Sequence, residues 1–364
     1  MKKSLISKNN EYELPVFLTD ATFSVVKSLD SKDISDSKIK GIVVNTYHAL
    51  TNPGSDSISR MGGIKKFMNF NGLVVTDSGG WQIFSLIHRN KKAGKITEKG
   101  VVFSYGKLKG KVFTPEDCID TQFEIGSDII ICLDDFTPPN VSKNKILGTV
   151  ERTVRWAKRC KDRYEANLIK YGFDKSNRPL LFAVVQGGDL IEMRKYCIDK
   201  LLEIGFDGYG FGGYMIDENG NLDLKVSKEL AEMIPNDFFK FALGVGDPYQ
   251  VVKCLDYGWE IFDCTLPTRD ARHKRLYVYT KDVLSKSDLE NPDFFKYVYL
   301  GKDKYKESDT KISEFCDCYT CQNYSLGYLN HLFKINSVSA QRLASIHNLR
   351  FYSMLFETYS KLKN

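Results

Sequence analysis

The stretch that decides the fold is "GLVVTDSGG", residues 72–80, an apolar run that ends in an aspartate and two glycines. Seven further runs share this form, at 14–20, 41–48, 127–135, 179–188, 208–213, 239–247 and 259–267. Runs of this length that are apolar on both faces are typical of buried parallel strands. Helical patterns lie between several of them, as at 149–172 and 191–205. This alternation predicts an α/β fold, a (β/α)8 TIM barrel, although spacing alone does not exclude an open doubly wound sheet.

Two stretches interrupt the pattern of strands and helices. Residues 88–118 have the alternation and glycine turns of hairpin strands, which predicts an insertion after the third strand. Residues 279–313 are polar and rich in lysine, which predicts an excursion on the surface. We therefore expect a barrel over 1–280 with an insertion near 88–118. A smaller subdomain over 281–364 would follow, with a last helix, 337–362, that packs on the barrel.

Composition limits the class of protein. The chain has 364 residues, of which 42% are hydrophobic and 27% charged, as in soluble globular proteins. Its basic N-terminus lacks the apolar segment of a signal peptide, and no apolar run is long enough to span a membrane. Nine cysteines without a secretory signal predict a reducing cytoplasm, where metal binding or catalysis is commoner than disulfides.

The net charge of +6 is uneven along the chain. From residue 268 onward there are 16 Lys and Arg against 11 Asp and Glu, so most of the positive excess lies in this last part. Such an excess is a weak indication of a polyanionic partner, nucleic acid first. A solvated, lysine-rich surface explains the charge equally well.

A TIM barrel places its chemistry at the C-terminal ends of the strands. A single aspartate after a strand is most often a helix N-cap. Three strands that direct carboxylates toward one place are costly as mere structure, because like charges repel and burial disfavours ionisation. We therefore expect an active site among the polar residues at these ends, which are Asp77, Asp134, Asp135, Gln186 and Asp263, with glycine pairs at 79–80, 187–188 and 212–213.

A cysteine cluster, "CDCYTC", occupies residues 316–321. Cys316, Cys318 and Cys321 have the spacing of ligands of a tetrahedral zinc ion whose fourth ligand comes from elsewhere, either His331 or His347. Three cysteines and one histidine would close the coordination sphere and make the site structural. The alternatives are three reduced cysteines in a turn, or an iron–sulfur cluster, for which a fourth cysteine at a usual spacing is missing.

Several longer motifs together resemble one protein family. They are "NTYHAL" (45–50), "GGIKKFMNFNGLVVTDSGGWQIFSL" (62–86), "VVQGG" (184–188), "GYGFGGY" (208–214), "LGVGDP" (243–248), "FDCTLPTRDAR" (262–272), "CDCYTC" and "IHNLRFY" (346–352). In this order they resemble the motifs of the tRNA-guanine transglycosylases, bacterial-type catalytic subunit. The resemblance runs from about residue 15 to 357, which is nearly the whole chain.

The resemblance implies an enzyme of queuosine tRNA modification. Such an enzyme exchanges guanine at the anticodon wobble position, 34, for a 7-deazaguanine, either preQ1 or queuine. The implied partners are a tRNA with a GUN anticodon, the free 7-deazaguanine and guanine. It further implies a cytoplasmic homodimer with no membrane contact and one structural zinc ion per chain.

The resemblance also implies a role for particular residues. Asp263 falls on the nucleophile and Asp77 on the general acid/base. Exchange at C1′ with retained stereochemistry independently calls for two displacements through a covalent ester, with one group acting as acid and then as base. Raising the pKa of Asp77 while Asp263 stays ionised would suit these roles.

The implied substrate residues are Asp77, Ser78, Gly79, Gly80, Trp81, Asp134, Gln186 and Gly213. The implied RNA-binding residues are Gly244, Val245, Gly246, Asp247, Pro248, Tyr249, Gln250, Thr268, Arg269, Asp270, Ala271 and Arg272. The implied metal ligands are Cys316, Cys318, Cys321 and His347.

Some residues depart from the usual motifs, namely Asn52, Phe136, Tyr214, Met215, Ile216, His273, Lys274 and Leu326. A bulky Ile216 leaves little room for the cyclopentenediol of queuine and favours preQ1. The changes between 273 and 326 fall in parts expected to face RNA.

Two alternative functions therefore stay open. One is a related transglycosylase that acts on another nucleic acid such as DNA or uses an unusual deazapurine. The other is a non-catalytic RNA-binding partner subunit, against which the presence of Asp77 and Asp263 argues.

Overall fold

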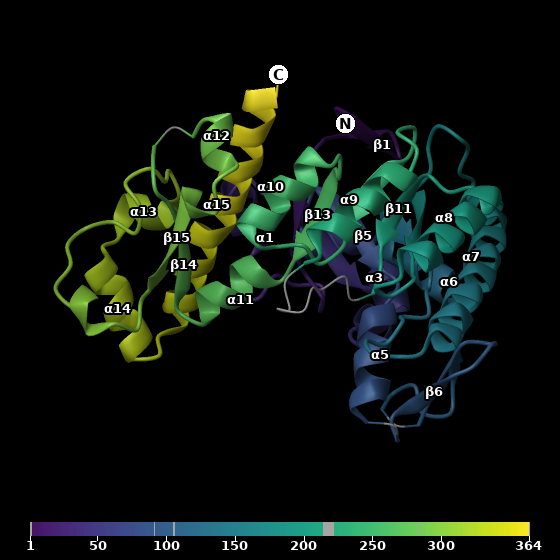
Figure 1. The fold of residues 1–364 in the computed structure, drawn as a ribbon. Coiled ribbons are helices and arrows are strands. Elements are labelled where there is room, and N and C mark those ends of the chain that lie inside the picture. Colours follow the sequence, from purple (N-terminus) through teal and green to yellow (C-terminus); the bar gives the residue numbers. More distant parts are fainter. Residues whose placement is uncertain (1, 91, 105, 214–221, 283, 364) are drawn as a thin grey trace.

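The structure is a computed structural model that describes residues 2–363 apart from 91, 105, 214–221 and 283. Within 81–89 it leaves out the side chains of Trp81, Phe84, His88 and Arg89. Figure 1 shows the barrel and, on one side of it, the C-terminal elements. Among the described residues, no helix combines the length and the apolar character needed to cross a bilayer.

Eight parallel strands of the described chain form a closed barrel, which confirms the predicted fold and excludes the open sheet. Around the barrel the order is β10, β11, β12, β13, β3, β4, β5 and β9. Each of the eight apolar runs contains one strand. In chain order the strands are β3 (Val16–Asp20), β4 (Gly41–Asn45), β5 (Leu73–Asp77), β9 (Ile129–Ile131), β10 (Leu180–Val185), β11 (Gly208–Phe211), β12 (Phe239–Ala242) and β13 (Ile261–Cys264).

The barrel interior is filled by alternate residues of these strands. They form one buried apolar cluster, separate from the larger core between the strands and the helices. Side chains alternate along a strand, so the position two residues beyond each interior residue continues the inward series. After Leu18, Val43, Val75, Val184 and Ile261, these next positions are Asp20, Asn45, Asp77, Gln186 and Asp263. The C-terminal end of the barrel is therefore polar.

A hairpin that the sequence did not predict lies at the opposite end. It consists of β1 (Ser4–Ser7) and β2 (Asn10–Glu13). Its Leu5 belongs to the same buried cluster as the interior residues of the strands, as does Leu14 just after β2. The hairpin therefore covers the N-terminal end of the barrel with apolar side chains.

Helices surround the strands, as the alternation predicts. They are α1 (Ser31–Asp36), α2 (Thr46–Thr51), α3 (Ser55–Arg60), α4 (Ile64–Met68), α5 (Gly80–Arg89), α6 (Pro115–Ile125), α7 (Lys143–Tyr171), α8 (Ile191–Ile204), α9 (Leu224–Met233), α10 (Pro248–Asp256) and α11 (Leu266–Arg272). The long helix α7 begins six residues before the predicted 149, because the Ser142 hydroxyl caps it by accepting from the backbone N–H of Lys145. It ends at Gly172, whose φ of 70° suits a left-handed cap.

The predicted insertion contains a three-stranded antiparallel sheet made of β6 (Gly94–Ile96), β7 (Val101–Phe103) and β8 (Val112–Phe113). Figure 1 shows β6 next to α5, away from the C-terminal elements. Phe103 and Phe113 of this sheet are buried, so the insertion contributes to the main core.

The C-terminal part contains an antiparallel pair, β14 (Arg275–Tyr279) and β15 (Phe295–Tyr299). Its helices are α12 (Lys286–Leu289), α13 (Tyr319–Asn323), α14 (Leu326–Lys334) and α15 (Val338–Lys363), with short 3₁₀ turns at Pro292–Phe294 and Asp303–Tyr305. The prediction of a surface excursion over 279–313 is wrong around β15, because Phe294, Val298 and Leu300 are buried. The apolar stretch 294–300, which contains a single lysine, Lys296, was hidden by the lysine-rich sequence on either side of it.

Helix α15 joins the C-terminal elements to the barrel. The ring of Tyr352 lies 4.6 Å from that of Phe17 on β3, and the ring of Phe356 lies 5.6 Å from that of Phe262 on β13. This helix therefore packs on the barrel in the way expected for 337–362. The division of domains at residue 280 stays a prediction. The pairing of β14 with β15 crosses this boundary.

Candidate active site and metal site

Asp77 is the last residue of β5 and has a fixed set of hydrogen bonds. Asn45, at the end of β4, donates from Nδ2 to both carboxylate oxygens at 2.8 and 3.0 Å. The backbone N–H of Gly79 donates to Oδ1 at 2.7 Å, which the left-handed φ of 78° at this glycine allows. Burial raises the pKa of Asp77 to about 7, although these hydrogen bonds oppose the rise. The charges of Asp263 and Asp20 raise it further.

Asp263, on β13, lies at the same end of the barrel. Its Oδ1 accepts from the backbone N–H of Gly244 at 3.0 Å. Burial raises the pKa of Asp263 to about 6, and the charge of Asp20 adds to this. Burial thus raises the pKa values of both carboxyls, and it raises that of Asp77 more than that of Asp263. Two carboxyl groups that titrate close together near neutral pH can supply an anion and an acid at the same time.

Asp134 and Gln186 form a buried pair beside this site. Gln186 donates from Nε2 to Asp134 Oδ2 at 2.5 Å, and the Ser78 hydroxyl donates to Oδ1 at 3.2 Å. Burial raises the pKa of Asp134 to about 6, and the hydrogen bonds from Gln186 and Ser78 oppose the rise. Gly80 allows this arrangement, since a Cβ there would lie 2.6 Å from Asp134 Oδ1. The pair presents amide and carboxylate groups, which can recognise the donors and acceptors of a purine edge.

Asp20 ends β3, between β13 and β4 in the barrel, and is a site residue that the sequence analysis missed. Its Oδ1 accepts from the backbone N–H of Thr22 at 3.2 Å and from the Thr22 hydroxyl. The signal was present in the sequence, because "LTD" (18–20) ends an apolar run just as "VTD" (75–77) does.

Arg194, on α8, is a second residue that the sequence analysis missed. Its guanidinium is fully buried and donates to the carbonyl oxygens of Val185, Gly188 and Gly212 at 3.1, 2.9 and 3.0 Å. Its Nη2 has no partner among the described residues. Burial lowers the pKa of Arg194 to about 10, which still leaves it protonated at neutral pH. Arg194 therefore holds together the ends of β10 and β11, where Gln186 and Gly213 lie.

Replacing Arg194 by methionine is expected to destabilise the fold strongly. The change leaves three buried carbonyl groups without their donor, which costs about 3–5 kcal/mol in total. The urea midpoint of unfolding measures the loss. Lys195→Met is the matched control: Lys195 is exposed and pairs only with Asp199 among the described residues, so its midpoint should not move. Equal midpoints for the two variants would contradict this role for Arg194.

Not every polar residue at a strand end belongs to the site. Asp135 is buried against α7, where Arg152 Nη1 donates to it at 2.5 Å, so the expectation that it faces the same site is wrong. The side chain of Trp81, on α5, and the departures Tyr214, Met215 and Ile216 lie outside the described residues. Phe136 is buried.

The segments predicted to contact RNA are partly engaged in the fold. In 244–250, Asp247 caps α10 by accepting from the N–H groups of Tyr249 and Gln250 at 3.1 Å. In 268–272, Arg269 is exposed, whereas Asp270 is buried and pairs with Arg275 at 2.6 Å.

Two of the positions that depart from the family motifs, His273 and Lys274, directly follow the second segment, and a third, Leu326, begins α14. Lys274 has a left-handed φ of 68°, a conformation that is easiest for glycine, and His273 is exposed. Leu326 is buried, so the expectation that it faces RNA is wrong.

Cys316, Cys318, Cys321 and His347 gather in one buried cluster, and their ligand atoms all lie within 4.8 Å of one another. His347 Nε2 lies 2.8 Å from the carbonyl oxygen of Tyr277, so this nitrogen carries the proton. Nδ1 then faces the cysteines, 3.3 Å from Cys321 Sγ and 3.7 Å from Cys318 Sγ. Three thiols and one imidazole nitrogen, so placed, can hold a metal ion. His331 is not part of the cluster.

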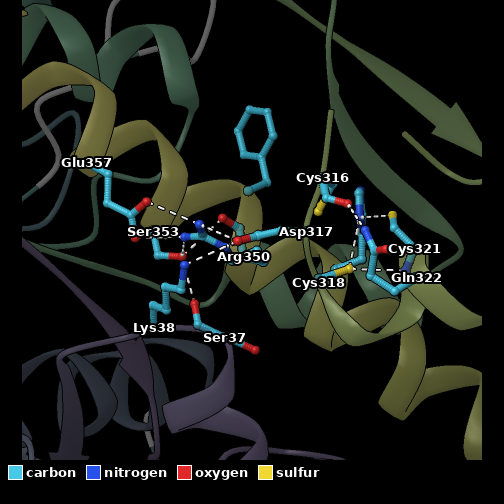
Figure 2. A network of polar contacts seen from close by, with 12 residues as sticks. Ser37, Lys38, Cys316, Asp317, Cys318, Cys321, Gln322, Arg350, Ser353 and Glu357 are labelled. Carbon is cyan, nitrogen blue, oxygen red and sulfur yellow. Dashed lines mark hydrogen bonds and ion pairs between the residues drawn. The ribbon is translucent and has the colours of Figure 1, made fainter. Parts of the chain in front are cut away.

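Arg350 ties this cluster to the rest of the chain (Figure 2). It donates to Asp317, which lies between two of the cysteines, at 2.5 and 3.0 Å, and to Glu357 at 2.8 and 3.1 Å. It also donates to the Ser353 hydroxyl, which in turn donates to the carbonyl oxygen of Ser37 after α1. The cysteine loop is thereby connected through α15 to the barrel side of the molecule.

Comparisons with known proteins agree with this arrangement. The family described as "Queuine tRNA-ribosyltransferase" matches residues 3–361. A relative of that name from Methylacidiphilum infernorum (isolate V4) is 35% identical over 356 residues, covering 97% of this chain and 89% of its own. Relatives of the same name from Psychrobacter sp. (strain PRwf-1) and Staphylococcus aureus (strain JH9) are 35% and 34% identical over 96% of this chain and 86% and 85% of theirs. The chain therefore belongs to the queuine tRNA-ribosyltransferase family, the tRNA-guanine transglycosylases.

Proposed function

We propose that this enzyme exchanges guanine at position 34 of tRNAs with a GUN anticodon for a free 7-deazaguanine, through a covalent intermediate on Asp263. The observation that supports this best is the pair of carboxyl groups at one end of the barrel. Burial raises the pKa of Asp263 to about 6 and that of Asp77 to about 7, so one can be ionised while the other is protonated.

In the first displacement, the Asp263 carboxylate attacks C1′ from the face opposite the base. The C1′–N9 bond breaks, and Asp77 donates its proton to the leaving guanine, which gives a ribosyl ester and an Asp77 carboxylate. In the second displacement, Asp77 accepts the N9 proton of the incoming base. That base attacks C1′ and expels Asp263, so stereochemistry is retained. Gly244 and Asn45 orient the two carboxylates throughout.

Asp134 and the residues around it would recognise the base. Its carboxylate would accept from N1–H and the exocyclic amine of guanine, and Gln186 with the N–H of Gly213 would donate to O6. Adenine has a donor where guanine has O6, so such a site disfavours it. Arg194 supports this part through its bond to Gly212 O. We favour preQ1 as the free base on the sequence argument at Ile216.

We propose zinc as the metal of the cysteine cluster, because three thiolates and an imidazole are a common closed zinc site. We also propose a cytoplasmic homodimer. An exposed aromatic surface supports it: Tyr319 and Tyr328 are 48% and 46% exposed, and the rings of Tyr324 and Tyr328 stack 5.4 Å apart beside a cavity of about 540 Å³.

Removing the metal is expected to loosen the C-terminal part while the barrel keeps its chemistry. Elemental analysis should find one zinc ion per chain in the wild type and none in His347→Ala, and limited proteolysis should cut this variant within 300–336. His331→Ala is the control and should keep the metal. Loss of the covalent adduct in a metal-free protein whose fold survives intact would count against a purely structural zinc.

Exchange of radiolabelled guanine tests the proposed function. We expect label to enter a tRNA with a GUN anticodon and not a duplex DNA of the same sequence. Labelling of DNA alone would favour the related transglycosylase with another substrate. No labelling and no adduct on any nucleic acid, with Asp263→Asn behaving like the wild type, would favour the non-catalytic partner subunit.

A further inference from the structure

We propose that Asp20 accepts a hydrogen bond from the 2′-hydroxyl of the nucleotide being exchanged, and that it thereby selects RNA over DNA. The inference rests on the proposed function, because it assumes that a nucleotide is bound with C1′ at Asp263. Asp20 would then be a third functional carboxylate, in addition to Asp263 and Asp77, which carry out the reaction.

Asp20 lies at the C-terminal end of the barrel, on a strand that neighbours the strand of Asp263. Asp20 ends β3, which pairs with β13 on one side and with β4 on the other. It continues the inward series of Val16 and Leu18, in the same way as Asp263 continues that of Ile261. Asp20 is therefore the carboxylate on the strand next to the nucleophile. Its charge raises the pKa of both Asp263 and Asp77, which agrees with this proximity.

The fold occupies only one of the two carboxylate oxygens of Asp20. Thr22 donates to Oδ1, whereas Oδ2 has no donor among the residues that the structure describes. The salt bridges of the described chain do not include Asp20. It is not a helix N-cap either, because α1 begins at Ser31 and Asp30 caps it. Asp20 is only partly buried, so its second oxygen is open to a hydrogen-bond donor of the substrate.

The chemistry of the substrate also favours a contact between Asp20 and the sugar. Asp134 and Gln186 lie at the ends of β9 and β10, away from β13 and β3 in the strand order, so the base and the sugar occupy different sides. C2′ is bonded to C1′, so its hydroxyl is the sugar donor nearest to the atom that Asp263 attacks. Hydrogen bonds to this hydroxyl strengthen as positive charge develops on the sugar ring in the transition state. The 2′-hydroxyl also separates RNA from DNA.

The experiment compares two anticodon stem-loop RNAs that are identical except for one 2′-deoxy substitution at the target guanosine. Guanine exchange, as kcat/KM, is measured with each RNA for the wild type, Asp20→Ala and Asp20→Asn. Wild type should prefer the all-ribose RNA by roughly 10- to 100-fold, because a site built to bind a hydroxyl rejects the analogue that lacks it. In Asp20→Ala this preference should fall to roughly 3-fold or less. Dividing the preference of the variant by that of the wild type cancels the difference in intrinsic reactivity between the two sugars.

Other outcomes separate this proposal from the function on which it rests. An unchanged preference in both variants would overturn the role of Asp20 while leaving the exchange reaction in place. No exchange by the wild type on the all-ribose RNA would instead overturn the proposed function. If Asp20→Ala does not fold, Asp20→Leu is measured in its place, because leucine has a similar shape and cannot accept a hydrogen bond. If a folded variant does not turn over, the ratio of Kd values for the two RNAs decides in the same way.

Discussion

Replacing Asp263 by asparagine is expected to abolish guanine exchange, with a loss of roughly 10⁴- to 10⁶-fold in kcat, as for other covalent catalysts without their nucleophile. An amide is a far weaker nucleophile toward C1′ than a carboxylate, so no ribosyl ester forms. Single-turnover exchange of labelled guanine measures the rate, and denaturing electrophoresis of the enzyme mixed with RNA measures the adduct.

The unfolding temperature of Asp263→Asn serves as the control for its folding. Burial raises the pKa of Asp263 in the folded state above the ordinary value, to about 6. The stability that protonation gives is therefore fully present below about pH 4 and is lost as the pH rises through about 6. Asparagine is neutral and can still accept from Gly244 N–H. Asp263→Asn should thus unfold at the same or a higher temperature than wild type at pH 7.5. A variant that is well folded and still exchanges guanine at the wild-type rate would contradict the assignment.

Replacing Asp77 by asparagine should lower exchange by roughly 10²- to 10⁴-fold, the usual contribution of a general acid. It should also change the pH dependence. In the wild type, kcat/KM should rise as Asp263 ionises near pH 6 and fall as Asp77 loses its proton near pH 7. These two values belong to an interacting pair, so the profile reports apparent pKa values of both groups together. The falling limb should be absent in Asp77→Asn.

Asn45→Ala provides the matched control for this profile. Its amide donates to both oxygens of Asp77 and so lowers the pKa of that carboxyl. Without it the pKa of Asp77 should rise, and the falling limb should move to higher pH while the rising limb stays in place. The pH profile of kcat/KM for the three proteins measures this. A falling limb that persists unchanged in Asp77→Asn would assign the acid to another group.

The barrel could be predicted because its signal is local. Each strand is a short apolar run that ends in polar or glycine residues, so the number of strands and the end that carries the chemistry follow from eight separate stretches. Gly79 illustrates the same locality, because the left-handed turn that directs its N–H to Asp77 requires a glycine where the sequence has one. The cysteine spacing predicted three ligands, while family resemblance was needed to choose His347 over His331.

The remaining features depend on contacts between distant segments. Arg194 looks like one more charged residue of an amphipathic helix, and only the packing of α8 against β10 and β11 buries it. Asp134 and Asp135 are adjacent in the sequence, yet one meets Gln186 and the other meets Arg152 on α7. Asp20, in contrast, could have been predicted from its local sequence. It ends an apolar run in the same way as Asp77 does.

The covalent mechanism is tested by identifying the residue that carries the sugar in the trapped intermediate. Wild-type enzyme is mixed with an anticodon stem-loop RNA at a pH between 6 and 7, quenched in denaturant, digested with nuclease and protease, and analysed by peptide mass. We expect a ribosyl adduct on the peptide that contains Asp263, at that carboxylate alone. An adduct on Asp77 or Asp20, or exchange that proceeds with no adduct on any residue, would contradict it.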